Sequence, residues 1–267
     1  MNNVALGHAA ELAPVETVRV KFQRYHNADA PLDDVAMDNL LGLRIQDSER
    51  QAMNTLAQHM PTEYRGENLW LGADYVWSHY EDIRSTVKAL SLSPDDVVYD
   101  LGSGYGRLPL YVGLTTPAKA KGIEILAERS EAAQAAKQGL GLESVDFITG
   151  NVLDQDISDG TVFYMFNPFS DHTFRQVADE LKELAATKRI TIVSSNDHVF
   201  YDQGWLTEVA RPNWLTVVYE SNDLAKEQPS AAAATPDDPT REAHANHRTT
   251  ARILRLLGSS LKAAIQK

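Results

Sequence analysis

A run of alternating glycines constrains the fold more than any other feature of the sequence. Gly102, Gly104 and Gly106 follow the apolar stretch at residues 97–101 and precede a helical pattern at residues 108–114. Glycine lets a backbone turn sharply and approach a ligand closely. The amide groups that open the following helix lack partners within that helix. A strand, a glycine turn and a helix in this order predict a ligand site at the carboxyl end of a parallel strand.

The same alternation of strand, turn and helix continues to residue 220. We expect further strands at residues 120–124, 145–149, 161–166 and 190–195, and helices at residues 126–138 and 171–186. This pattern predicts an α/β fold with a doubly wound, mainly parallel sheet and helices on both faces. Two last segments, residues 206–211 and 214–220, predict a C-terminal antiparallel hairpin that closes the sheet.

The segments on either side of this core differ from it in composition. Residues 1–90 predict an N-terminal helical cap, and residues 91–221 the ligand-binding core. Residues 222–247 are rich in alanine and proline and predict a flexible linker. Residues 248–267 carry five basic and no acidic side chains and predict an amphipathic helix. We expect this basic helix to dock on the domain, with a helix for interaction or for a membrane surface as the alternative.

Two acidic residues indicate which ligand the glycine turn holds. Asp100 ends the first strand just before the glycines, where its charge would repel a pyrophosphate and suit a cationic amino group. The methionine half of S-adenosylmethionine (SAM) carries such a group. Glu124 ends the second strand, and an acid about 20 residues after a glycine turn accepts hydrogen bonds from ribose hydroxyls. Glu124 would suit NAD as well as SAM, so the preference for SAM depends on Asp100.

Residues 97–220 resemble class I SAM-dependent methyltransferases. The resemblance lies in residues 100–106, which match motif I of that family, and in Glu124, which matches the acidic motif that follows it. It implies that Gly102, Ser103 and Gly104 line the cofactor site together with the two acids.

The resemblance also implies an adenine site after the third strand. The family usually has an aspartate there that holds the adenine amino group, and this chain has Asn151, whose side-chain oxygen accepts the same hydrogen bond. The backbone amide of Val152 would face the adenine ring. Asn151 as an ordinary turn residue is the alternative, and Asp154 is the second choice for the adenine contact.

A third motif follows the fourth strand and predicts the acceptor site. Asn167, Pro168 and Phe169 resemble the Asn-Pro-Pro-aromatic motif of methyltransferases that modify amino nitrogens, with Phe169 in place of the second proline. The amide oxygen of asparagine accepts a hydrogen bond from the amine and aims its lone pair at the methyl group. A plain strand-to-helix turn, with Phe169 in the core, is the alternative interpretation.

Two weaker candidates lie near the same edge of the sheet. His198 follows the fifth strand, where it would serve either as a general base or as a surface or capping residue. An aromatic segment that contains Tyr75, Trp77, His79 and Tyr80 would form either a lid over the methionine moiety or part of the core of the cap.

We expect an enzyme that transfers the methyl group of SAM to a protein lysine or a small amine by direct displacement. Residues 100–104 are also similar to the loop of lysine methyltransferases that lack a SET domain. The net charge of −12 suits a cationic target and disfavours general nucleic-acid binding. The alternatives are O-methylation of a small metabolite with His198 as base, a SAM-binding protein without turnover and, more distantly, a NAD-dependent oxidoreductase.

The rest of the composition bears on metal sites, disulfides and location in the cell. The chain has no cysteine, which excludes disulfides and thiolate metal sites, and its eight histidines show no spacing typical of metal ligands. The first twelve residues contain no Lys or Arg, unlike the start of a signal peptide, and no apolar run is long enough to span a membrane. We therefore expect a cytoplasmic protein without a metal.

Overall fold

A computed structural model describes residues 15–28, 33–45, 77–166, 168–169, 171–195, 200 and 203–222. All of them belong to the first of two compact units of the chain, residues 1–226. The helices of the described part are α1 (Val15–Asn27), α2 (Asp34–Leu41), α4 (Tyr80–Leu90), α5 (Arg107–Thr115), α6 (Ala127–Gly139) and α7 (Asp171–Ala185), with a 3-10 turn, η2, at Val152–Asp154. The strands are β1 (Val97–Leu101), β2 (Lys119–Glu124), β3 (Val145–Thr149), β4 (Val162–Met165), β5 (Thr191–Ser194), β6 (Leu206–Ala210) and β7 (Val217–Ser221).

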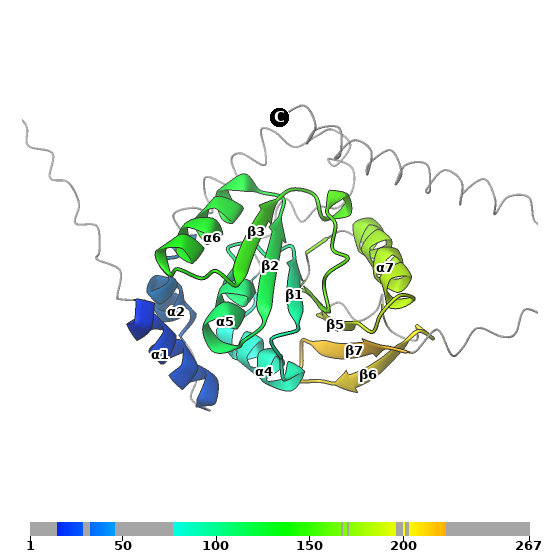
Figure 1. Ribbon diagram of the computed structural model, residues 1–267, viewed down its shortest axis with the longest axis horizontal. Coiled ribbons are helices and arrows are strands. Elements are labelled where there is room, and N and C mark those ends of the chain that lie inside the picture. The colour runs from blue at the N-terminus through cyan, green and yellow to red at the C-terminus, as the bar shows by residue number, and fades with distance from the viewer. Residues whose placement is uncertain are drawn as a thin grey trace, which may run out of the picture. The chain divides into compact units, whose positions relative to one another are not determined.

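The strands form one sheet in the order β3-β2-β1-β4-β5-β7-β6 (Figure 1). Strands β1 to β5 pair in parallel, whereas β7 runs antiparallel to both β5 and β6. This confirms the predicted fold class: a mainly parallel sheet with helices and a C-terminal antiparallel hairpin. The carboxyl ends of β1, β2 and β4 therefore lie along one edge of the sheet, which is where ligands bind in such folds.

The two faces of the sheet build two separate apolar cores. Alternate residues of β1 point to opposite faces, so that Val98 enters one core and Tyr99 the other. The first core lies under α4, α5 and the N-terminal helices, and the second lies under α7, which covers the opposite face. A strand that is buried on both faces is a nearly continuous apolar run, which explains why β1 could be predicted from the sequence.

The helices at the N-terminus pack on the first core. Helix α2 begins at an Asp33 cap, whose carboxylate accepts hydrogen bonds from the backbone of Val35 and Ala36, and it ends at Gly42 with φ 77°. Phe22 of α1 is fully buried and meets Tyr111 of α5 edge-on. The predicted helical character of this region is confirmed for α1, α2 and α4.

Several sequence-based expectations fall outside the described residues. They are the part of the helical cap at residues 46–76, the greater part of the linker, residues 223–247, and the C-terminal helix at residues 248–267. No helix among the described residues is long and apolar enough to cross a membrane.

Candidate cofactor and acceptor site

The glycine turn leaves β1 and opens α5 in a conformation that requires glycine. Gly102, Gly104 and Gly106 have φ values of 88°, 53° and 77°, a region that side chains with a Cβ rarely adopt. A Cβ on Gly102 would also lie 2.3 Å from the Cβ atom of Pro168. The first motif therefore packs directly against the third motif, so the turn and the predicted acceptor segment share one site.

Glu124 ties the glycine turn to the second strand. Its carboxylate is buried, and its two oxygens accept hydrogen bonds from the backbone N–H of Gly104 (2.8 Å) and of Leu126 (2.9 Å). The position of Glu124 beside the turn fits the contact with ribose hydroxyls that the sequence predicts.

Asp100 and Ser103 fit the methionine end of SAM. Burial, and secondarily the charge of Glu124, raise the pKa of Asp100 to about 8. A cationic amino group brought beside it would stabilise the anion. The Ser103 hydroxyl is buried without a hydrogen-bond partner among the described residues, which is unusual for a native polar group and is what a bound ligand would satisfy.

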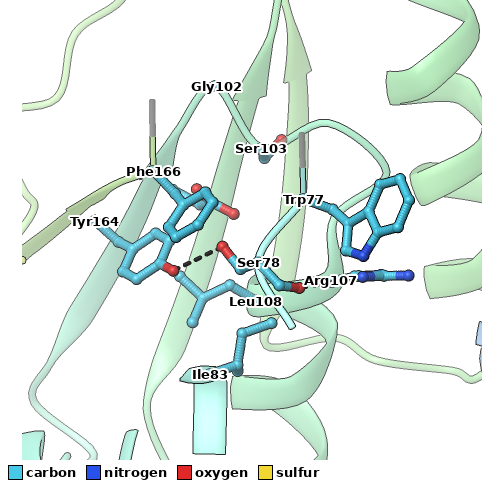
Figure 2. Close-up of a pocket in the computed structure, with 10 residues that line it drawn as sticks. Trp77, Ser78, Ile83, Gly102, Ser103, Arg107, Leu108, Tyr164 and Phe166 are labelled. Atoms are coloured by element: carbon cyan, nitrogen blue, oxygen red, sulfur yellow. Dashed lines mark hydrogen bonds between the residues drawn. The ribbon is translucent and has the colours of Figure 1, made fainter. Parts of the chain in front are cut away.

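A pocket opens at the carboxyl edge of the sheet, beside these two residues (Figure 2). The space between its walls is about 350 Å³, a volume that includes open solvent. The lining residues come from the glycine turn, the start of α5, the end of β4 and the segment before α4: Trp77, Ser78, Ile83, Asp100, Gly102, Ser103, Arg107, Leu108, Tyr164 and Phe166. On one wall the Ser78 and Tyr164 hydroxyls are hydrogen-bonded at 2.7 Å. Burial raises the pKa of Tyr164 far above its usual value, so this phenol stays neutral.

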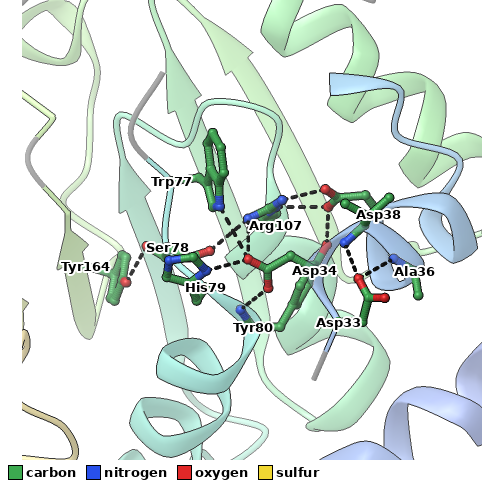
Figure 3. A network of polar contacts seen from close by, with 11 residues as sticks. Asp33, Asp34, Ala36, Asp38, Trp77, Ser78, His79, Tyr80, Arg107 and Tyr164 are labelled. Carbon is green, nitrogen blue, oxygen red and sulfur yellow. Dashed lines mark hydrogen bonds and ion pairs between the residues drawn. The ribbon is translucent and has the colours of Figure 1, made fainter. Parts of the chain in front are cut away.

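Arg107, the first residue of α5, connects this pocket to the N-terminal helices (Figure 3). Its guanidinium forms a bidentate ion pair with Asp38 of α2, with Nε 2.9 Å from Oδ1 and a second bond from Nη2 to Oδ2. A third bond of 3.1 Å runs from Nη1 to the carbonyl of Ser78. The guanidinium also lies over the rings of Trp77 (5.4 Å) and Tyr80 (5.0 Å). Arg107 thus connects the pocket wall to Asp38 of α2, to the Ser78 backbone and to two aromatic rings.

Asp34, one turn before Asp38, holds the segment that enters α4. Its carboxylate accepts hydrogen bonds from the Tyr80 backbone (3.0 Å) and the Trp77 indole (3.3 Å), and it lies 2.5 Å from Nδ1 of His79. Sequence reasoning missed Asp34, Asp38 and Arg107. The resemblance of residues 100–106 to a known motif ends just before Arg107, and no local pattern pairs it with a residue 69 positions away.

The aromatic segment divides between core and pocket. Tyr80 is fully buried and belongs to the first core, which supports the core interpretation for this residue. Trp77 lines the pocket at its mouth and is partly exposed, which supports the lid interpretation there. His79 is exposed, and Tyr75 lies outside the described residues.

At the predicted adenine site, Asn151 is seen in a capping role. Its side-chain oxygen accepts a hydrogen bond of 3.1 Å from the backbone of Leu153, at the start of η2. This is the turn function that the sequence left as the alternative, and the contact with adenine stays a prediction. Val152 is buried in the second core directly after it, and Asp154 closes the same short turn.

The acceptor motif is described only in part. Phe166 lines the pocket, and Pro168 lies on Gly102. Phe169 is half-buried and meets Phe174 of α7 edge-on, 6.2 Å between ring centres, so it packs toward the second core. Asn167 and His198 lie outside the described residues. Among the residues that the structure does describe, no group of three or more His, Asp or Glu side chains is arranged to hold a metal.

Comparison with known proteins shows which proteins this chain is related to. The family model described as histone methylation protein DOT1 matches residues 73–201. A protein-lysine N-methyltransferase of Saccharolobus islandicus (strain REY15A) is 32% identical over 133 residues, which are 49% of this chain and 79% of the relative.

Two solved structures are similar to this chain at lower identity. An RNA methyltransferase from Salinibacter ruber, in complex with S-adenosyl-L-homocysteine, is 20% identical with a TM-score of 0.43, covering 61% of this chain and 100% of its own. A SAM-dependent methyltransferase from Aquifex aeolicus is 16% identical with a TM-score of 0.41, covering 52% of this chain and 88% of its own.

The sheet order, the glycine turn and the paired strand-end acids are those of a class I SAM-dependent methyltransferase, as the sequence predicted. Within that class, the chain belongs to the DOT1 family. SAM is its cofactor, which confirms the choice of SAM over NAD.

Proposed function

We propose that this protein methylates the ε-amino group of lysine in protein substrates. The observation that carries the proposal is the 32% identity to a protein-lysine N-methyltransferase over 133 residues. The DOT1 match, residues 73–201, includes every residue that lines the pocket. The relatedness therefore covers the part of the chain that would meet both cofactor and acceptor.

The chain's own residues supply position and electrostatics. SAM carries a methyl group that its sulfonium already activates for displacement. Asp100 and Ser103 would hold the methionine end of SAM, and Glu124 would hold the ribose. A neutral lysine amine needs to be aimed rather than deprotonated in the transfer step, because its lone pair is the nucleophile. By its place between Phe166 and Pro168, Asn167 is the proposed aiming residue.

Incubation with methyl-labelled SAM and a panel of acceptors tests the proposal. The panel holds lysine-containing peptides and proteins, small amines and hydroxylated metabolites. We expect label in lysine peptides, removed when every lysine is replaced by arginine. Label in hydroxylated metabolites alone would point to O-methylation. SAM binding without transfer to any acceptor would support a binding protein without turnover.

Two substitutions separate N-methylation from O-methylation. Asn167→Ala should lower turnover roughly 10²-fold with SAM affinity nearly intact, since misplacing a reacting atom by about 1 Å costs that much. His198→Ala should change turnover little, because an amine that is already neutral needs little help from a base. Turnover of both variants, measured across a pH series, checks this ranking. A dominant His198 effect, with a rate that rises through the histidine pKa, would favour O-methylation.

A further inference from the structure

The turn that joins β6 to β7 lies on the same edge of the sheet as the pocket. Met165, the last residue of β4, is in register with Ser194 of β5, and Ser194 is in register with Val217 of β7. Phe166 of the pocket follows Met165, while Trp214 precedes Val217 by three residues. Three residues span at most about 10 Å. Trp214 therefore lies at the carboxyl edge, on the hairpin side of the acceptor motif.

Asn213 anchors this turn to the helix that lines the pocket. Its side-chain oxygen accepts hydrogen bonds of 2.9 Å from the backbone of Leu215 and of Thr216. Its amide nitrogen donates to the Asp82 carbonyl (3.4 Å) and to the Ser85 hydroxyl (3.0 Å) of α4. Figure 1 shows the hairpin turn beside α4. The backbone around Trp214 is thus held against α4, the helix that contributes Ile83 to the pocket.

The anchored turn presents a bare indole. Trp214 is 86% exposed, more than any other large hydrophobic side chain of the described residues. Tryptophan is strongly buried on average, and it is enriched where proteins bind partners. Core packing does not explain why a tryptophan occupies position 214, because its side chain is exposed and the turn is anchored by Asn213 instead.

Two acidic side chains lie at the start of α4, the helix to which Asn213 anchors the turn. Glu81 is exposed (64% of its side chain), and Asp82 is half-buried. Burial raises the pKa of Asp82, and the charges of Glu81 and Asp34 raise it further, while His79 opposes them. Two nearby cations are already paired: Arg84 lies 3.9 Å from Glu81, and Arg211 is bonded to Glu208 at 2.7 Å and 2.9 Å. The local charge around the indole therefore favours a cationic partner.

We propose that Trp214, Glu81 and Asp82 form a docking ledge for a basic segment of the protein substrate next to the target lysine. This inference rests on the proposed lysine methylation. An arginine or lysine of the substrate would lie over the indole face, a geometry that attracts cations. The two carboxylates would add long-range attraction, in keeping with the net charge of −12.

Substitution at the ledge should act on substrate binding. Trp214→Ala should raise KM about fivefold or more for a peptide with arginines beside its lysine, since aromatic anchors of this kind dominate binding. Little effect is expected for the same peptide with glutamines in place of the arginines. The loss should fall on KM rather than kcat, because the contact is the same in ground state and transition state. SAM affinity and melting temperature should stay at their wild-type values.

Val209→Ala is the matched control. Val209 is also an exposed apolar residue of the hairpin (48%), and it belongs to strand β6 and not to the turn itself. We expect wild-type KM for both peptides. A second readout, independent of turnover, is the anisotropy of the fluorescein-labelled arginine peptide, whose dissociation constant should rise with KM in Trp214→Ala only.

The outcomes separate the ledge from the proposed function. Equal KM and equal peptide affinity in wild type and Trp214→Ala would overturn the ledge and leave lysine methylation standing. Peptide binding that depends on Trp214 without any methylation would support the ledge and contradict the activity. A loss of affinity equal for the arginine and glutamine peptides would overturn the cationic partner.

Discussion

Asp100 is a buried carboxyl group, so its ionised form is unfavourable unless a cationic group of the cofactor lies beside it. Because burial raises its pKa to about 8, the folded protein keeps the Asp100 proton at pH values where the unfolded chain has lost it. For a group with a raised pKa, the stability is fully present below the unfolded value of 3.8 and is lost as the pH rises toward 8. The slope is at most about 1.4 kcal/mol per pH unit.

Asp100→Asn should remove this dependence. The variant should melt above the wild type at pH 7–8 and approach it near pH 4, because an amide has no proton to lose. It should bind SAM more weakly, because the cationic amino group loses its anion. Thermal melts from pH 4 to pH 8, with and without SAM, check both effects. A variant that melts below the wild type at every pH would contradict the pKa argument.

At the scale of single residues, the sequence predicts those site residues whose surroundings are set by nearby positions in the chain. Asp100, Ser103 and Glu124 lie at strand ends and in a glycine turn, and their surroundings follow from a few neighbouring positions. Arg107 adjoins the same turn, but its ion pair is with a residue 69 positions away, and no short-range pattern indicates it. For Asn151 the sequence could not choose between two local roles, because a turn cap and an adenine contact both require an asparagine at this position.

At the scale of elements, the strands and the hairpin were predictable because burial on both faces and alternation leave direct traces in the sequence. The close packing of elements leaves no such trace. Gly102 was expected to serve the ligand, and the structure gives it a second constraint, the contact with Pro168 after β4. The spacing of the two motifs in the sequence did not indicate that they touch.

Gly102→Ala tests this contact against a matched control. Gly102 (φ 88°) and Gly141 (φ 58°) both have positive φ. Replacing either with alanine should lower stability by about 1–2 kcal/mol because of the backbone conformation alone. A Cβ on Gly141 meets nothing within 4 Å, whereas one on Gly102 lies 2.3 Å from Pro168. Gly102→Ala should therefore cost about 1–3 kcal/mol more than Gly141→Ala and should also weaken SAM binding. Denaturant unfolding and calorimetric SAM titration of both variants provide the comparison, and equal costs would contradict the close packing of the two motifs.

At the scale of the whole molecule, the N-terminal helices and the sheet share one apolar core. Phe22 of α1 meets Tyr80 of α4 and Tyr111 of α5 edge-on, at 6.1 Å and 5.9 Å between ring centres. Arg84 of α4 donates a 2.8 Å hydrogen bond to the Ala28 carbonyl, just beyond the end of α1. Amphipathic patterns predicted helices in this region, but they did not show which face of the sheet the helices would cover.

Phe22→Ala tests whether this shared core makes the N-terminal helices and the sheet one cooperative unit. Phe22 is fully buried, and truncating such a side chain costs about 3–5 kcal/mol. If the unit is cooperative, calorimetry should show a single transition at a lower temperature, with the loss of α-helix and of tertiary structure coinciding. Val20→Ala on the same helix should change stability by no more than about 0.5 kcal/mol, because Val20 is 53% exposed. A separate low-temperature transition in Phe22→Ala, with SAM binding unchanged above it, would instead show that the N-terminal helices unfold independently of the methyltransferase core.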